Sequence, residues 1–175
     1  MDPEELLQIV KAARDRGEVP DLRHADLRSI TLHGVDLSQV DLRYANLSDA
    51  SLIGVNLSEA NLTGANLARA NLASAKLEAA MLLGVNLAEA NLEGVNLLNA
   101  NLRNANLGQA NLRWAQLVET TFRGAGLIVA NLRHGNLEGA NFIRADLRGA
   151  KVTTDQLRVV KSLKGAIMPD GTRHD

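Results

Sequence analysis

An apolar residue recurs at every fifth position of this chain from residue 22 to residue 152. The 27 positions of this series hold 24 leucines, and Phe122, Phe142 and Val152 occupy the other three. Two residues before each position, from residue 25 to residue 150, a second small apolar site holds Ala or Val in 23 of 26 cases. The residue between the two sites is Asn or Asp in 18 of 26 repeats. The repeating unit is therefore small, polar, Leu, variable, variable.

A period of five residues fits neither an α-helix nor a plain β-strand. On a helix, each step of five turns the side chain by about 140°, which scatters the leucines around the whole circumference. On a strand, residues five apart point to opposite faces. The chain must therefore turn in every repeat, with Leu and the small residue inside and the other three residues outside. Because a single unit could not bury its own leucine, the repeats must stack into a solenoid.

Segments such as 60–64 (ANLTG) and 70–74 (ANLAS) resemble the A(D/N)LXX signature of pentapeptide-repeat proteins. The resemblance covers residues 20–152 and implies an all-β solenoid, a right-handed quadrilateral β-helix with four pentapeptides in each coil. Phe122 and Phe142 lie twenty residues apart, as such a coil requires. With 26 repeats, 26/4 gives about 6.5 coils, and a spacing of roughly 4.8 Å predicts a rod about 31 Å long.

The residue types at the corners have physical reasons. Asn and Asp side chains bond to nearby backbone groups and tolerate turn conformations, so they suit the repeated polar site. Glycine recurs two places after the Leu, where a corner needs freedom in φ. The glycines in this position are Gly34, Gly54, Gly64, Gly84, Gly94, Gly124, Gly139 and Gly149.

The first 19 residues differ in composition from the repeats and predict an N-terminal capping helix. Asp2 suits the N-cap, Pro3 follows at the first helical position, and Gly17 stops the run. Apolar residues recur between them at helical spacing. One face of this helix can therefore pack against the open end of the solenoid, whose backbone groups would otherwise be unpaired.

A second capping helix is predicted after the repeats. Thr153 and Gln156 form a capping-box pattern, and Gly165 closes the run. Its apolar face comprises Leu157, Val160 and Leu163. The predicted division is an N-terminal capping helix over 1–19, a β-helix over 20–153, and a capping helix with a polar tail over 154–175.

Composition narrows the functional classes. The chain has 175 residues, 46% of them hydrophobic, and no cysteine, which predicts one domain with a substantial core and no disulfide or thiol chemistry. Residues 1–5 lack the basic start and apolar stretch of a signal peptide, and no run approaches about 18 apolar residues. We therefore expect a cytoplasmic protein that does not associate with membranes.

No pattern of catalytic or ligand-binding residues emerges. His24, His33, His134 and His174 are scattered, and none has a second His or a carboxylate at metal-ligand spacing. The serines occupy variable sites without an ordered base beside them. We predict a protein that is not an enzyme and has no catalytic residues, no cofactor and no metal site.

The best-known members of the family confer quinolone resistance by binding DNA gyrase, and the resemblance implies an acidic rod that imitates DNA. Duplex DNA carries one negative charge per roughly 1.7 Å, so a rod of about 31 Å would need about 18. Residues 21–152 contain 12 acidic and 12 basic residues, so their net charge is zero. We therefore favour a protein-interaction scaffold of unknown role, with gyrase binding as the alternative and a purely structural role as the third.

Assigning the outward residues to four sides predicts an uneven distribution of charge. The side built on Leu37 and every twentieth residue after it carries five carboxylates against a lone cation, Lys76. These carboxylates belong to Asp36, Glu59, Glu78, Glu119 and Glu138. Two opposite sides collect arginines, namely Arg23, Arg43, Arg103, Arg123 and Arg144 on one and Arg113 and Arg133 on the other.

One group of outward residues suggests a binding site. Trp114 and His134 should stack one coil apart, beside Arg113 and Arg133. Because Trp and Arg are enriched at binding hot spots, we predict that these four residues form a protein-docking patch. The alternative is that Trp114 lies flat on the rod with solvated arginines nearby. We expect a protein partner of unknown identity rather than nucleic acid, since exposed aromatic residues are few, and a monomer rather than a dimer.

Overall fold

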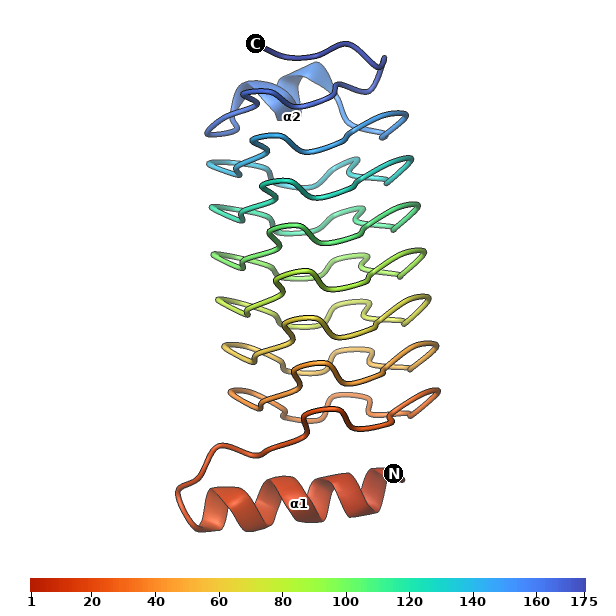
Figure 1. Cartoon of the computed structure of the whole chain (residues 1–175), viewed down its shortest axis with the longest axis vertical. Coiled ribbons are helices and arrows are strands. Elements are labelled where there is room, and N and C mark those ends of the chain that lie inside the picture. The colour runs from red at the N-terminus through yellow and green to blue at the C-terminus, as the bar shows by residue number, and fades with distance from the viewer.

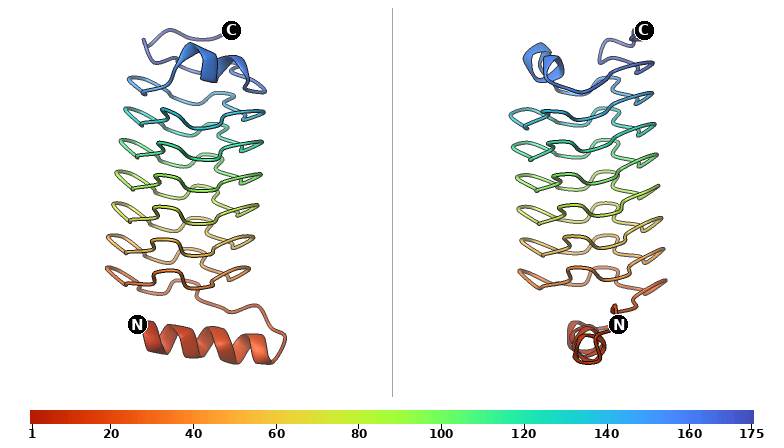
Figure 2. Two further views of the ribbon diagram at one scale, coloured as in Figure 1. Left: turned by 180° about the vertical axis from the view of Figure 1, so that it is seen from behind. Right: turned by 90° about the vertical axis from the view of Figure 1, so that its left-hand side faces the viewer.

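The computed structural model describes residues 1–175, and its repeats form a stack of coils with a helix at each end (Figure 1). Helix α1 spans Pro3–Asp15 and helix α2 spans Thr154–Arg158. Between them, consecutive coils contact one another through isolated parallel β-bridges. Views from behind and from the side show the same parallel stack, with α1 lying across its N-terminal end (Figure 2).

The register of the bridges sets the length of a coil. Each bridge within the repeats joins a residue to the one twenty further on, from Asp21 with Asp41 to Asn131 with Lys151. A coil therefore takes twenty residues, or four pentapeptides. Backbone hydrogen bonds flank each bridge, as where the N–H of Leu22 donates to the carbonyl of Asp41 over 2.8 Å. Equivalent repeat positions consequently form columns along each side of the rod.

Columns of Leu and small residues make the core. Fifty buried residues form one continuous cluster. Phe122 and Phe142 stack inside it with ring centroids 4.9 Å apart and ring planes 9° apart. Thr120 takes the place of the usual Ala or Val and is fully buried, and its hydroxyl donates to the carbonyl of Leu97 over 2.7 Å. The one hydroxyl in the small-residue column is therefore satisfied.

Every corner residue two places after the Leu, from residue 24 to residue 149, has a positive φ. The eight glycines predicted at corners are among them, and the other eighteen residues are not glycine. A backbone bond closes the corner, as where the N–H of Ala25 donates to the carbonyl of Leu22 over 3.2 Å. Positive φ at the third residue of such a turn is the feature of a type II turn.

The polar column stabilises the corners and links the coils. Asn46 Oδ1 accepts the N–H of Ser48 over 3.1 Å, which is the local bond expected of Asn in a turn. The amide groups also bond along the rod, because Asn66 donates to Asn46, Asn86 to Asn66, and Asn106 to Asn86, over 3.0–3.2 Å. An amide ladder of this kind adds one side-chain bond to each coil-to-coil contact that it spans.

Helix α1 begins where the sequence predicts. Asp2 is the N-cap and accepts the N–H of Glu5 over 2.9 Å, and Pro3 opens the first turn. Leu6 and Val10 are buried and belong to the core cluster. This amphipathic helix therefore continues the core beyond the first coil, with its polar face outward.

The C-terminal helix is shorter than the predicted run to Gly165. The capping box of Thr153 and Gln156 forms, but α2 ends at Arg158 after five residues. Gln156 also reaches the coil below, where its Nε2 donates to the carbonyls of Leu132 and Gly135 over 2.7 and 2.9 Å. The helix thus supplies side-chain donors to the last coil.

After α2 the chain returns to the stack. Ser162 bridges Asn141 and Ile167 bridges Asp146, so the step between coils is 21 residues here instead of 20. The extra residue is accommodated by the helix. Residues 162 and 167 therefore extend the stacked part of the chain beyond the predicted boundary at residue 153.

Candidate functional site

Each side of the rod can be named after its first leucine, which gives the Leu22, Leu27, Leu32 and Leu37 sides in chain order. Because a coil has four sides, the Leu22 side lies opposite the Leu32 side. The predicted docking patch lies in the C-terminal half of the Leu32 side. The acidic residues predicted to group together lie on the Leu37 side, which adjoins both.

The structure brings Trp114 and His134 together as the twenty-residue register predicts. Their rings stack with centroids 4.2 Å apart and planes inclined by 13°, and 52% of Trp114 is exposed. The backbone N–H of Trp114 donates to the backbone carbonyl of Arg133 over 3.2 Å, and this bond fixes the two coils against each other. Arg133 and His134 also line a hollow of about 410 Å³ together with Thr153 and Gln156.

A second exposed stack, on the Leu22 side near α1, was not singled out from the sequence. His24 and Tyr44 stack with ring centroids 5.3 Å apart and planes inclined by 16°. A Cβ at Gly64 would stand 2.6 Å from the ring of Tyr44, so glycine leaves room for this ring on the next coil. The signal was available, because His24 and Tyr44 are corner residues separated by twenty.

The Leu37 side carries carboxylates that are held by neutral donors. Glu78 accepts hydrogen bonds from the hydroxyl of Ser58 and the amide of Asn96, each over 2.7 Å. Asp36 is different, because Arg14 of α1 reaches it with an N···O distance of 3.2 Å. The glutamates Glu59, Glu78, Glu119 and Glu138 form no ion pair.

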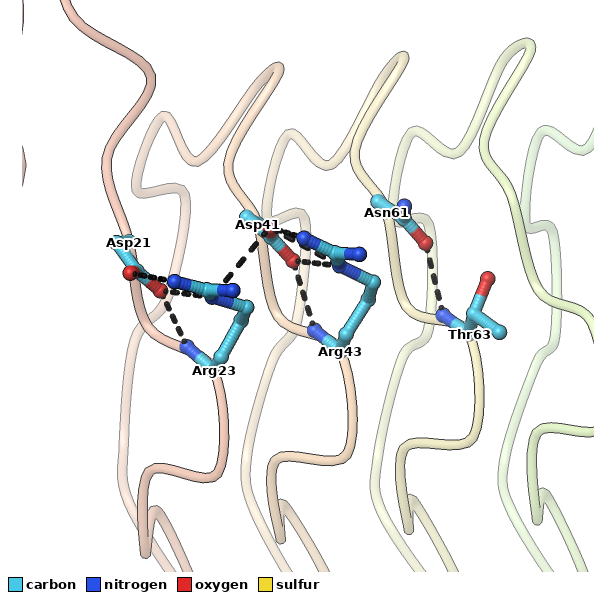
Figure 3. Close-up of polar contacts among 6 residues, drawn as sticks. All are labelled: Asp21, Arg23, Asp41, Arg43, Asn61 and Thr63. Carbon is cyan, nitrogen blue, oxygen red and sulfur yellow. Dashed lines mark hydrogen bonds and ion pairs between the residues drawn. The ribbon is translucent and has the colours of Figure 1, made fainter.

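Apart from Arg69, which pairs with Asp49 of the adjacent coil at 2.8 Å, the arginines of the repeats fall into two groups. In the first, Asp stands two residues before Arg and the two side chains pair within one repeat, as for Asp21 with Arg23 at 2.6 Å (Figure 3). The Arg28 guanidinium, with the Arg28 backbone N–H, lowers the pKa of Asp26 to about 2. This Asp-Leu-Arg pattern occurs, and pairs, at residues 21–23, 26–28, 41–43 and 146–148.

In the second group, Asn or Thr replaces the Asp and the guanidinium has no carboxylate partner. Asn111 Oδ1 accepts the backbone N–H of Arg113 over 3.3 Å but no guanidinium N–H, in the same way as Asn61 Oδ1 accepts the backbone N–H of Thr63 over 3.1 Å in Figure 3. The segments of this kind are 101–103, 111–113, 121–123 and 131–133, and Arg144 is also without an ion pair. Both arginines of the predicted docking patch belong to this group.

No three His, Cys, Asp or Glu side chains gather so that they could hold a metal ion. Every buried side-chain nitrogen and oxygen atom has a hydrogen-bond partner. Neither helix is long and apolar enough to cross a membrane.

Comparison with known families agrees with the repeat geometry. Residues 21–58, 50–87, 86–124 and 127–153 match the family described as pentapeptide repeats, with eight copies. The chain therefore belongs to the pentapeptide-repeat family. No curated protein sequence matches the chain significantly.

Several solved structures are similar to the chain. A pentapeptide repeat protein of the Arabidopsis thaliana thylakoid lumen is 24% identical, with 84% of this chain and 86% of that chain covered and a TM-score of 0.53. A pentapeptide repeat protein from Nostoc is 32% identical, with 66% and 86% covered and a TM-score of 0.50. The plasmid-mediated fluoroquinolone resistance protein QnrB1 is 21% identical, with 86% and 87% covered and a TM-score of 0.49. None of these similarities assigns a partner to this chain.

Proposed function

We propose that this protein is a non-enzymatic interaction scaffold that binds a partner protein through the docking patch of Arg113, Trp114, Arg133 and His134. The observation that carries the proposal is the half-exposed indole of Trp114, stacked on His134 and accompanied by two arginines without carboxylate partners. An aromatic anchor with free guanidinium groups nearby is the composition of a binding hot spot. A complementary partner surface would offer carboxylates around an aromatic or apolar group.

Rigidity supports this proposal. The stack on His134 holds the indole before any partner arrives, and the bond from the Trp114 backbone N–H to the Arg133 carbonyl fixes the corner that carries it. A side chain that is already ordered loses little conformational entropy on binding, so more of the contact energy appears as affinity. The backbone beneath the patch is also ordered before binding, because it belongs to a stack of hydrogen-bonded coils.

We further propose that the rod works as a capped monomer. Leu6 and Val10 of α1 cover one end. At the other end, the side-chain amide of Gln156 in α2 donates hydrogen bonds to backbone carbonyls of the last coil. An uncovered end would present unpaired backbone groups that could template association with a second rod. The two helices therefore favour side-on recognition over end-to-end assembly.

Imitation of DNA towards gyrase is a weaker explanation of the surface. The net charge of residues 21–152 is zero, whereas a full imitation would need about 18 negative charges. The free arginines also lie on two opposite sides, where a DNA mimic would present carboxylates. Gyrase binding is therefore kept as an outcome of the test.

The test is affinity capture from an extract of the source cells with three forms of the protein. The wild-type rod is compared with Trp114→Ala/Arg133→Ala and with a matched control, Tyr44→Ala/Arg43→Ala. The control removes the other exposed aromatic stack together with the arginine beside it, on the opposite side. We expect a partner that is captured by the wild type and the control and is lost with the docking-patch variant.

The other outcomes each decide against part of the proposal. A partner retained by Trp114→Ala/Arg133→Ala would exclude the patch as its site. Recovery of gyrase subunits would instead support the DNA-mimic alternative. Capture of no specific partner by any of the three forms would favour a purely structural role.

A further inference from the structure

Four cations follow one another along the C-terminal half of the Leu22 side. Arg103 and Arg123 occupy the same repeat position in adjacent coils, where the N–H of Asn104 donates to the carbonyl of Arg123 over 2.9 Å. Lys164 takes this position two coils further on. Arg144 stands one residue along in the coil between, and its N–H donates to the carbonyl of Lys164 over 3.0 Å. These four residues are called the arginine row.

Three members of the arginine row share one hollow. Arg103, Arg123 and Arg144 together line a hollow of about 120 Å³, with Ile143 as its apolar part. Arg144 also borders a neighbouring hollow of about 420 Å³, whose lining includes Arg173 of the C-terminal tail. None of these cationic side chains takes part in an ion pair.

No carboxylate of the rod neutralises the arginine row. The outward positions of the Leu22 side hold no Asp or Glu from residue 61 to residue 165. On the adjoining Leu37 side, the carboxylate of Glu119 lies over Gly139, where it occupies the space that a Cβ would need. On the adjoining Leu27 side, Asp146 is already paired with Arg148 at 2.6 Å. Asp170 and Asp175 of the C-terminal tail also form no ion pair with the row, so its four cations are open to the carboxylates of a partner.

The spacing of the row selects the shape of a partner. Successive coils are about 4.8 Å apart, so cations in four coils stand at about 0, 4.8, 9.6 and 14.4 Å along the rod. Residues i, i+3, i+7 and i+10 of an α-helix rise by about 0, 4.5, 10.5 and 15 Å and share one face. Alternate residues of an extended strand, about 6.6 Å apart, lose this register at the second coil.

We propose that the arginine row binds the acidic face of an α-helix in a partner protein, with the helix axis along the rod. Carboxylates at i, i+3, i+7 and i+10 would each meet one cation, and guanidinium groups can take a carboxylate through two parallel N–H donors. Met81, one coil before Arg103 on the same side, is 44% exposed and can receive an apolar residue from the end of that helix. This surface lies opposite the docking patch and does not depend on it.

A nucleic-acid strand fits the row less well than an acidic helix. Five cations, including Arg173, are few for a site that depends on phosphate contacts, and the adjoining Leu37 side is acidic. The row also carries no aromatic side chain on which a base could stack. An acidic protein helix needs neither a large number of cations nor an aromatic side chain for stacking.

The direct test measures binding of two synthetic helical peptides to the full-length protein by fluorescence anisotropy. One peptide carries Glu at i, i+3, i+7 and i+10, with Leu one turn before the first Glu. The other has the same composition and helicity, with the Glu residues distributed around the helix. We expect the patterned peptide to bind more tightly and its affinity to fall as salt is added.

An Asp placed two residues before an arginine should neutralise that arginine without removing it. Asn101→Asp/Thr121→Asp creates two Asp-Leu-Arg-type segments, in which Arg103 and Arg123 should pair within their own repeats as Arg23 does with Asp21. Removing two of four charge contacts should weaken binding of the patterned peptide by about tenfold. The matched control, Asn71→Asp/Asn131→Asp, adds the same charge on the opposite side and should leave the affinity unchanged.

Three outcomes would contradict the proposal. Equal binding of the two peptides would exclude the helical register, and unchanged binding to Asn101→Asp/Thr121→Asp would exclude the row. Tighter binding of a single-stranded oligonucleotide than of the patterned peptide would mean that the row binds nucleic acid rather than an acidic helix. Trp114→Ala/Arg133→Ala should bind the peptide normally, which separates failure of this proposal from failure of the docking patch.

Discussion

Corner residues carry the main backbone strain of this rod. Eighteen of them adopt positive φ without being glycine, and each is held there because stacking of its coil on the next fixes both turn and register. The left-handed region costs an ordinary L-residue roughly 1–2 kcal/mol, and Asn tolerates it better than most. Val129, at φ 61°, is the one β-branched corner residue and the least suited to this conformation.

Relief of this strain should stabilise the protein. We expect Val129→Asn to raise the free energy of unfolding by about 1 kcal/mol, since Asn adopts the left-handed region readily. The reverse change, Asn99→Val at φ 59°, should lower it by a similar amount. Urea denaturation followed by circular dichroism measures both. A lower urea midpoint for Val129→Asn would mean that the exposed valine contributes packing that outweighs its strain.

The buried leucines should be far less tolerant than the outward ones. Leu92 is fully buried in a middle coil, and Leu92→Ala should cost about 2–5 kcal/mol because it leaves a cavity between coils that cannot close. Leu98 is 37% exposed, and Leu98→Ala should change stability by no more than about 0.5 kcal/mol. Thermal melts of the two variants give the comparison. Similar losses for both would contradict the assignment of inward and outward positions.

The twenty-residue register, more than residue type alone, determined which contacts at the candidate sites could be predicted from the sequence. Trp114 and His134 could be placed in contact because corner residues twenty apart share a column. The arginines could be grouped by side from the sequence, but the paired ones could not be separated from the free ones. That distinction depends on how an Asp at the polar site reaches the guanidinium two residues later, and this geometry became visible only in the folded repeat, as for Asp41 and Arg43 in Figure 3.

The two terminal elements differ in how far local signals determine them. Helix α1 has an N-cap, a proline and an apolar face, and its start at Pro3 agrees with these signals. Helix α2 has an equally good capping box, yet it ends at Arg158. Residues after it gain more from pairing with the coil below, where Ser162 bridges Asn141, than from continuing an isolated helix. Apolar spacing alone could not reveal this competition.

Gln156 should be the critical residue of the C-terminal element. In a continuous coil, the carbonyl of Val55 accepts the N–H of Lys76, and at Gly135 the side chain of Gln156 provides the equivalent donor. Gln156→Met keeps the size and helix propensity but removes these bonds, so we expect a loss of about 1–3 kcal/mol. Gln109→Met, at an exposed corner, is the control. Equal urea midpoints for the two variants would show that water replaces the Gln156 amide without cost.

At the scale of the whole molecule, charge is paired at the two ends of the rod and free between them. Arg23, Arg28 and Arg43 pair near the N-terminal end and Arg148 pairs near the C-terminal end, whereas no ion pair forms between residues 70 and 145. For the arginines two residues after the polar site, the presence or absence of Asp at that site sets this division. A repeat scaffold can thereby expose or neutralise an arginine by one substitution, without any change of backbone.

The same pairs should make stability depend on pH in the acid range. Arginine lowers the pKa of Asp21, Asp26, Asp41 and Asp146 in the folded protein, to about 2 for Asp26, whereas an unfolded Asp has a pKa of about 3.9. Because the folded pKa is depressed, this stabilisation is fully present above about pH 4 and is lost as the pH falls through the folded values. Salt should reduce the effect, since the pairs lie at the surface.

Replacing all four of these aspartates by Asn isolates their contribution. Asn at the polar site still accepts the backbone N–H two residues on, as Asn61 does from Thr63, so the turn should survive. We expect the melting temperature of the wild type to fall between about pH 4 and pH 2 more steeply than that of the four-Asn variant. The difference arises because only the wild type takes up protons at these sites on unfolding. Parallel profiles would show that these four ion pairs contribute no stability that depends on pH.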